Sequence, residues 1–309
     1  MSLIQAPNAV VMVRPWHFHS NPETAKDNAF QNTNRNSEME VSLNAKLEFD
    51  NVVKELSENG IRVHLFDDFG EKETPDSIFP NNWFSTHPGG HIAIYPMYAK
   101  NRRRERRSDI IEMLKSEYRV QDVVDFSGLE WDNVFLEGTG AMVLDHINRI
   151  AYTAKSNRAS EVILERFCSL FHFEPMAFDT ADKDGNSIYH TNVMMGLGTN
   201  YALISLSMIK DKDRREEVKS RIEESGRIIV DLSFEQIDNF AGNVLELSGT
   251  DNKKILALSK KAYDSLTNEQ IKIVEQSAKL VPLSIPTIEL AGGSVRCMLA
   301  GIHLSKRNS

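Results

Sequence analysis

Hydrophobic and polar positions follow a pattern that returns five times along the chain, at intervals of roughly 45 to 55 residues. Each unit predicts an extended hairpin, then an amphipathic helix, then a short apolar strand. The helical spacing is clearest where Ile163, Phe167, Leu170 and Phe171 fall on one stripe. We expect helices near 38–59, 103–118, 158–170, 211–225 and 267–278, and closing strands at 61–66, 120–126, 171–176, 227–232 and 279–283.

Strand pairs precede the predicted helices, most clearly at 141–152, 193–204 and 244–258. Five such units cannot each bury an apolar face alone, but around one axis they share a core, and loops from every unit meet at one end. The pattern therefore predicts an α/β fold, specifically a five-bladed α/β propeller of pseudo-fivefold ββαβ repeats. No linker-like tract divides the chain, so we expect a single domain over residues 1–309.

The composition is that of an ordinary globular protein, with 309 residues, 41% apolar and 26% charged. No apolar run approaches the roughly 20 residues that span a bilayer, and residues 1–11 lack the pattern of a signal peptide. The two cysteines, Cys168 and Cys297, do not make a disulfide framework. We therefore expect a cytoplasmic protein, with Cys168 in the core beside its helical stripe.

The formal charge of −8 argues against nucleic-acid and anionic-membrane partners. The exception is the arginine-rich run 102–107, where we favour a solvated helix start over a phosphate-binding patch. His17 and His19 face one side of a possible strand, but no third ligand stands at a suitable spacing. We therefore expect neither a metal nor a cofactor.

Four loop segments, 79–86, 133–140, 188–193 and 292–298, occupy equivalent places in their units. In the last, two glycines allow a tight turn close to a ligand. Cys297 follows them, and the adjacent Arg296 is a cation that can favour its thiolate. A thiol at such a turn can meet a substrate.

Each polar residue of these loops also has a plain structural alternative. Cys297 can open a core strand, His190 can be a strand-edge histidine, and Glu137 an ordinary turn residue. Asn81 and Asn82 can form an Asx turn, and Arg158 can start a surface helix. The four loop segments together, rather than any single residue, indicate a catalytic site.

The segment Gly-Gly-Ser-Val-Arg-Cys-Met at 292–298 resembles the nucleophile loop of the guanidino-group-modifying enzymes, the pentein superfamily. His190-Thr191-Asn192 is similar to its His-x-Asp element, and Glu137-Gly138 to its Glu-Gly-Gly-Asp element. Phe-Pro-Asn-Asn-Trp at 79–83 is most similar to the branch named citrulline utilisation hydrolases, often labelled amidinotransferase. The resemblance covers nearly the whole chain.

The resemblance implies a cysteine-dependent reaction in two steps at a planar carbon that bears nitrogens. Cys297 would be the nucleophile, and His190 would protonate the leaving amine and then deprotonate water. Glu137 would hydrogen-bond substrate nitrogens and orient His190, and Arg158 would pair with the α-carboxylate of the substrate.

Two positions that carry aspartate in the deiminases are asparagine here, Asn82 and Asn192. Carboxylates suit a cationic guanidinium, whereas an amide offers donors and an acceptor without charge. The substitutions therefore favour a neutral ureido side chain, citrulline first. Thr139 and Gly140 stand where the family's glutamate element ends in Gly-Asp, which changes the hydrogen bonding there.

We therefore expect a hydrolase of C–N bonds whose partner is a small amino-acid substrate. An amidinotransferase or an arginine deiminase-type enzyme is the enzymatic alternative, because the sequence does not show whether water or an amine enters. A non-catalytic binding protein of the same fold is the alternative from another class. The sequence does not decide between a monomer and a homo-oligomer.

Overall fold

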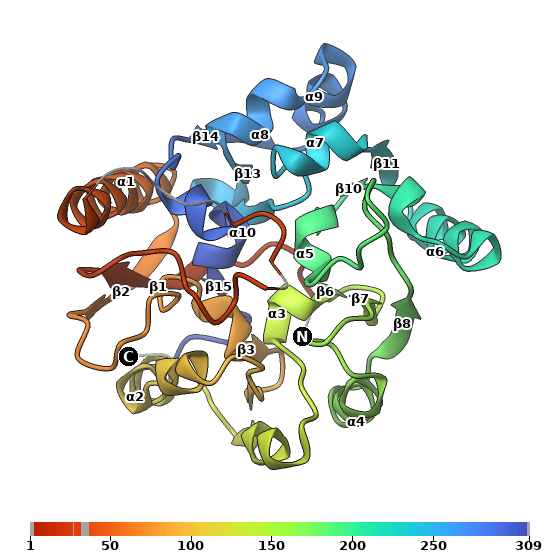
Figure 1. Cartoon of the computed structure of the whole chain (residues 1–309). Coiled ribbons are helices and arrows are strands. Elements are labelled where there is room, and N and C mark those ends of the chain that lie inside the picture. The colour runs from red at the N-terminus through yellow and green to blue at the C-terminus, as the bar shows by residue number, and fades with distance from the viewer. Residues whose placement is uncertain (1–2, 27, 32–36, 308–309) are drawn as a thin grey trace.

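Five three-stranded sheets surround a common centre in the computed structural model, which describes residues 3–26, 28–31 and 37–307 (Figure 1). In every sheet one strand pairs antiparallel with the middle strand, and the middle strand pairs parallel with the third. A helix connects each parallel pair, as a crossover requires. The predicted α/β order and the repeated unit are confirmed.

The first sheet contains β15 (Ala300–Gly301), β1 (Ala9–Pro15) and β2 (Arg62–Asp68), and the second β3 (Phe84–His87), β4 (His91–Ile94) and β5 (Asp122–Asp125). The third contains β6 (Met142–Asp145), β7 (Ile150–Ala154) and β8 (Glu174–Phe178). The fourth contains β9 (Met195–Leu197), β10 (Tyr201–Ile204) and β11 (Ile228–Asp231), and the fifth β12 (Leu245–Ser248), β13 (Lys254–Ser259) and β14 (Lys279–Leu283).

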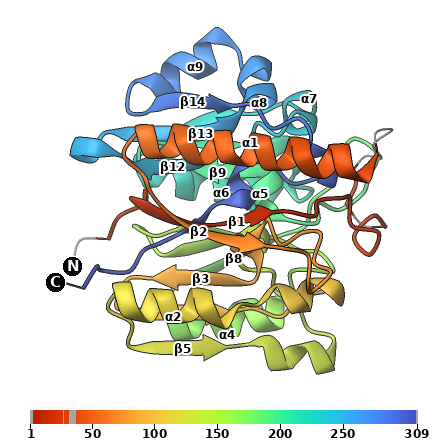
Figure 2. The same ribbon diagram turned by 90° about the vertical axis from the view of Figure 1, so that its left-hand side faces the viewer.

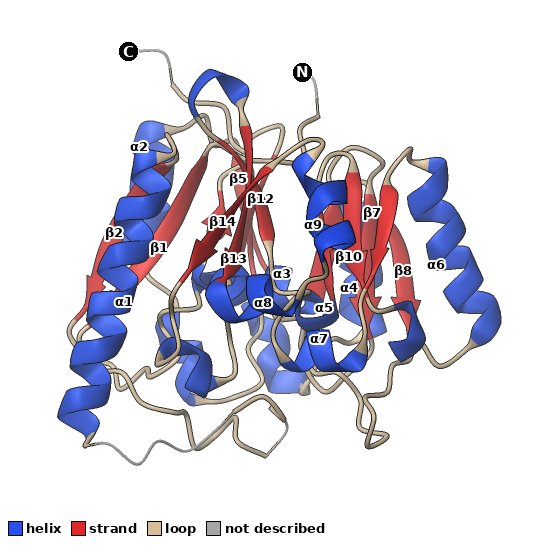
Figure 3. Ribbon diagram, turned by 90° about the horizontal axis from the view of Figure 1, so that it is seen from above, coloured by secondary structure: helices blue, strands red, loops and turns tan. Residues whose placement is uncertain are grey.

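The crossover helices lie on the outside of the sheets (Figures 1 and 3). They are α1 (Glu38–Glu58), α2 (Ser108–Glu117), α4 (Glu161–Phe171), α6 (Lys212–Glu224), and the pair α8 (Lys260–Ser265) and α9 (Asn268–Glu275). Shorter helices are α3 (Gly138–Ala141), α5 (Thr191–Met194), α7 (Phe234–Asp238) and α10 (Val295–Met298). None of the helices in the described part of the chain has the length and apolar character needed to cross a membrane.

The residue types explain where α1 begins and which of its faces is buried. Ser37 caps α1 by accepting a hydrogen bond from the Glu40 backbone N–H. The buried side chains of α1 recur every three or four residues, which is the spacing of one helical face. These are Val41, Ala45, Phe49, Val52 and Leu56.

Some predicted boundaries were wrong. The helix expected at 103–118 is two pieces, a 3-10 turn η2 (Asn101–Glu105) and α2, separated at Arg106 and Arg107. The strand expected from residue 171 begins only at Glu174, because His172 adopts a left-handed φ of 56° that ends α4. Leu170 is exposed rather than on the buried stripe, whereas Cys168 is buried in the core as predicted.

The first sheet is built from both ends of the described chain. Val10 of β1 lies opposite Val63 in the parallel pair and opposite Gly301 in the antiparallel pair. Figure 2 shows both termini on the same side of the molecule. The last strand therefore completes the sheet that the first strand begins.

A buried ion pair links the third and fourth sheets. Arg227, just before β11, donates to both carboxylate oxygens of Asp145 at the end of β6, at 2.6 and 3.1 Å, and to the Gly198 carbonyl at 2.7 Å. Both side chains of the pair are 1% exposed. A second pair, Arg221 with Glu174, lies nearby with 29% and 46% exposure.

We expect Arg227→Met to lower the free energy of unfolding by about 3–5 kcal/mol, because Asp145 is left as a buried charge without its partner. The matched change Arg221→Met breaks an exposed pair and should cost only about 0–1 kcal/mol. Urea unfolding followed by circular dichroism measures both. Equal losses in the two variants would contradict the structural role of the buried pair.

Candidate active site

Short turns precede the first strand of the sheets and point toward the centre of the molecule. They are η1 (Pro80–Asn82) before β3, α3 before β6, α5 before β9 and α10 before β15, and the three short helices lie near the middle of Figure 1. The sequence-predicted residues sit on or beside these turns and on the loop before α4. These are Asn82, Glu137, Arg158, His190, Asn192 and Cys297, each at most 3% exposed.

A hydrogen bond joins His190 to Glu137, with 2.8 Å between Nε2 and Oε2. Burial lowers the pKa of His190 below its ordinary value, although the Glu137 carboxylate partly opposes the shift. The imidazole is therefore neutral at pH 7 and able to accept a proton. Glu137 also accepts a hydrogen bond at Oε1 from the Tyr98 backbone N–H at 2.9 Å, which fixes the carboxylate.

Glu137 stays ionised despite its complete burial. Burial opposes the charged form, but Arg158, His190 and Arg102 outweigh it and hold the pKa of the carboxyl well below its usual range. Nη1 of Arg158 lies 3.5 Å from Oε2, and Nη1 of Arg102 lies 3.8 Å from the same oxygen. One carboxylate oxygen thus faces a histidine and two guanidinium groups.

Two side-chain amides face the sulfur of Cys297. Nδ2 of Asn192 lies 3.3 Å and Nδ2 of Asn243 lies 3.2 Å from Sγ. Each amide N–H can donate a hydrogen bond to the sulfur, and Sγ also lies 3.7 Å from Oδ1 of Asn243. Oδ1 of Asn192 is buried and has no hydrogen-bond partner, so it is an unused acceptor beside the sulfur.

Asn82 lies against Arg102. With its amide oxygen turned to Arg102, it accepts from Nη1 and Nη2 at 3.0 and 3.1 Å. A Cβ at Gly140 would lie 2.1 Å from the Asn82 side chain and 2.8 Å from Nδ1 of His190. Gly140 therefore allows Asn82 and His190 to approach each other across α3.

The structure contradicts the surface-helix alternative for Arg158, and it only partly supports the solvated helix start expected at 102–107. Arg158 is not at the surface: it is buried before α4, and its guanidinium lies 5.0 Å from the centre of the Tyr189 ring. The arginine run is only partly a solvated helix start. Arg102 is buried and paired with Glu105 at 2.8 and 3.0 Å, and burial raises the pKa of Glu105 to about 7 despite that partner.

The sequence reasoning missed Asn243 and Arg102. Asn243 lies in the turn before β12, at the fifth equivalent place, so the repeat itself was a signal that could have found it. Arg102 stood among four other arginines within six residues, and no local pattern separates it from them. His17 and His19 form no metal site with a third residue, since no group of three His, Cys, Asp or Glu within the described ranges is placed to hold a metal ion.

A segment near the N-terminus lies against this layer. Nδ2 of Asn28 donates to the Ala291 carbonyl at 3.3 Å, and Nδ2 of Asn21 donates to Asp76 at 2.7 Å. Phe30 packs on Tyr189, with 6.2 Å between ring centres. These contacts place residues 21–30, apart from residue 27, against the elements that carry the predicted site residues.

Solved structures with the same fold cover the whole chain. The N-terminal domain of ArgZ, described as an arginine dihydrolase from the ornithine–ammonia cycle in cyanobacteria, has a TM-score of 0.71 at 17% identity, over 96% of this chain and 98% of that chain. Unliganded AgrE has a TM-score of 0.73 at 16% identity, over 97% of this chain and 40% of its own. A dimethylarginine dimethylaminohydrolase in an adduct with S-methyl-L-thiocitrulline has a TM-score of 0.65 at 12% identity, over 96% and 100%.

No curated protein sequence matches the chain, and the chain spans about 40% of full-length ArgZ and AgrE. A model of one sequence family does match it, over residues 14–304. With the fold and this match together, the chain belongs to the family described as N,N dimethylarginine dimethylhydrolase, eukaryotic, within the pentein superfamily of guanidino-group-modifying proteins.

Proposed function

We propose that the protein is a cysteine-dependent hydrolase that cleaves a C–N bond in the ureido or guanidino group of a small amino acid. The observation that carries the proposal is the arrangement around Cys297. Two amides face its sulfur, and the His190–Glu137 pair lies in the same buried layer. A structural cysteine in a core strand needs neither of these features.

In the proposed reaction the Cys297 sulfur attacks the planar carbon, and a C–S bond forms while a C–N bond breaks. His190 passes the proton released by the thiol to the departing nitrogen, which leaves as an amine or ammonia. Water then adds to the carbon and gives a proton to His190, the C–S bond breaks, and the thiol is restored. Glu137 keeps the imidazole in one orientation.

The electrostatics favour a neutral ureido group, and citrulline is our first choice of substrate. Oε2 of Glu137 already faces His190, Arg158 and Arg102, and Oε1 accepts from the backbone. Little of this carboxylate is left for a further cation. The Asn192 amide can instead accept from a ureido N–H through Oδ1, and Arg158 supplies the planar fork for the α-carboxylate.

Arginine-type substrates are the second candidate. ArgZ is an arginine dihydrolase, and another structure with this fold is a dimethylarginine dimethylaminohydrolase. Transfer to an amine in place of water would make the enzyme an amidinotransferase. A non-catalytic binding protein is the remaining alternative, and it would not need the buried His190–Glu137 pair.

The proposal includes the wider organisation of the protein. We infer that the five sheets close into a five-bladed propeller and that residues 1–309 form one catalytic domain. Contacts of β15 with β3, of β6 with β9 and of β9 with β12 support the closure. Both cysteines are free, which is in keeping with a cytoplasmic protein. The partner that we propose is the small substrate, and the reaction uses no cofactor. The proposal does not choose between a monomer and a homo-oligomer.

We expect turnover of citrulline above arginine, dimethylarginine and succinylarginine, measured as release of ornithine or ammonia from each substrate incubated separately. Cys297→Ala should abolish the activity, because the nucleophile is lost, whereas Cys168→Ala should retain it. Turnover of arginine with citrulline inert would overturn the ureido argument. If a haloacetamidine failed to inactivate the protein and citrulline gave no protection, the binding-protein alternative would stand.

We expect Asn192→Asp to lower kcat/KM for citrulline by about tenfold to a hundredfold, because a carboxylate beside the sulfur opposes the thiolate and removes the amide donor. The ratio of arginine to citrulline turnover should rise at the same time, since a carboxylate suits a guanidinium. The isosteric change Asn252→Asp on the exposed surface is the control. An unchanged substrate ratio would show that Asn192 does not face the reacting group.

The pH dependence follows from His190, which must be neutral to accept a proton from water. Because its pKa lies below 6.5, the acid limb of kcat/KM should fall below pH 6.5. Glu137→Gln removes a partner that raises the pKa of His190, so the limb should move to lower pH. Arg158→Gln removes a cation that lowers it, so the limb should move to higher pH. Titration of the His190 ring by NMR checks both signs, and a shift in the same direction in both variants would contradict the assignment.

A further inference from the structure

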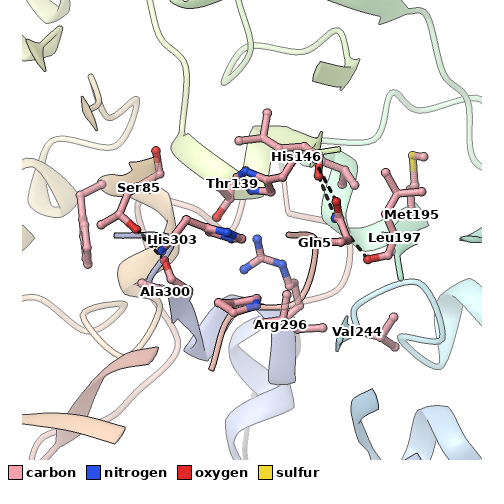
Figure 4. Close-up of a pocket in the computed structure, with 18 residues that line it drawn as sticks. Gln5, Ser85, Thr139, His146, Met195, Leu197, Val244, Arg296, Ala300 and His303 are labelled. Carbon is pink, nitrogen blue, oxygen red and sulfur yellow. Dashed lines mark hydrogen bonds between the residues drawn. The ribbon is translucent and has the colours of Figure 1, made fainter. Parts of the chain in front are cut away.

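A small cavity lies in the centre of the molecule, at the level of the first strands of the sheets (Figure 4). Every sheet contributes to its lining. The contributing strand residues are Ser85, Leu144, Leu197, Leu245 and Ala300. Thr139 of α3 and Arg296 of α10 also line it, so the cavity adjoins the turns that carry Glu137 and Cys297. Its volume, about 40 Å³ for water-sized spheres, holds about three waters.

Arg296 brings a positive charge into this cavity without a carboxylate to balance it. No acidic residue is among the described residues that line the space. The guanidinium donates to the Leu299 carbonyl at 2.9 Å, and the side chain is partly buried. Burial lowers the pKa of Arg296 to about 10, and Cys297 opposes the shift. A partly buried cation with no acidic neighbour in the cavity favours a counter-ion.

Histidine rings add unused hydrogen-bonding groups beside that charge. His146 and His303 stack with 3.7 Å between ring centres, and Figure 4 shows Arg296 extending toward His303. Nδ1 of each ring is buried without a hydrogen-bond partner. His146 is 6% exposed. Burial lowers the pKa of both histidines, and Arg296 lowers them further, so the rings are neutral and can each donate one N–H.

We propose that this central cavity binds a small monovalent inorganic anion, with chloride as the physiological example. The positive guanidinium and the acid-free lining select a negative ligand and repel a metal cation, and each neutral imidazole can donate one N–H to an anion. The volume suits a monatomic ion with one or two waters and excludes an amino acid or a nucleotide. The anion site is distinct from the residues proposed to act on the substrate, and it requires no catalytic activity.

Bromide is the probe for the site, because it replaces chloride and scatters X-rays anomalously. We expect an anomalous peak in the cavity, beside the Arg296 guanidinium, in crystals of the whole chain soaked in bromide. Absence of the peak at a bromide concentration that labels surface sites would overturn the proposal. The experiment uses the unaltered protein and measures no turnover, so its result is independent of the proposed reaction.

Thermal unfolding gives a second measurement in solution. At equal ionic strength, replacing gluconate by chloride should raise Tm by about 2 °C once chloride exceeds its Kd about tenfold. Arg296→Gln should abolish this rise, because the counter-charge is gone. Arg104→Gln, which changes an arginine with 48% side-chain exposure, should keep it. A chloride effect of the same size in both variants would overturn the assignment. If Arg296→Gln does not fold, His303→Phe takes its place, and the same outcomes decide.

Discussion

The hydrogen bond between His190 and Glu137 connects turns from two neighbouring sheets, and the buried polar layer is organised around it. Glu137 directly precedes α3 in front of the third sheet, and His190 directly precedes α5 in front of the fourth. Neither group can be buried alone, because an isolated carboxylate in the interior loses its hydration without replacement. The pair, with Arg158 and Arg102 beside it, makes the burial of all four groups tolerable.

The same layer separates charge in a way that sets its chemistry. Cations gather around Glu137, whereas neutral amides surround the sulfur of Cys297. The sulfur therefore lies among amide dipoles, and the charged groups of the layer gather at Glu137. Asn243 shows how the repeat produces this arrangement. The turn of every sheet reaches the centre, and side chains at equivalent places in the turns meet there.

The sequence predicted the repeated sheets because alternation and helical spacing are local properties, and each hairpin carried its own turn. It could not predict β15, since a strand of two residues has no period to detect. The break between η2 and α2 could not be predicted for another reason. Arg102 is buried in ion pairs with Glu105 and Glu137, and only the folded chain brings Arg102 to Glu137. The burial of Arg158 has the same long-range cause. The sequence singled out six candidate residues because the motifs of the resembled family mark their loops, and the structure buries all six. Asn243 lies outside those motifs.

The pairing of β1 with β15 has a consequence for the newly made protein. A ribosome delivers the chain from its N-terminus, so β1 and β2 emerge early with one edge of their sheet uncovered. That edge is filled only when Ala300 and Gly301 have been synthesised. The turn that carries Cys297 belongs to the same late segment. The Cys297 sulfur can therefore meet its two amide neighbours only after this late segment has been made.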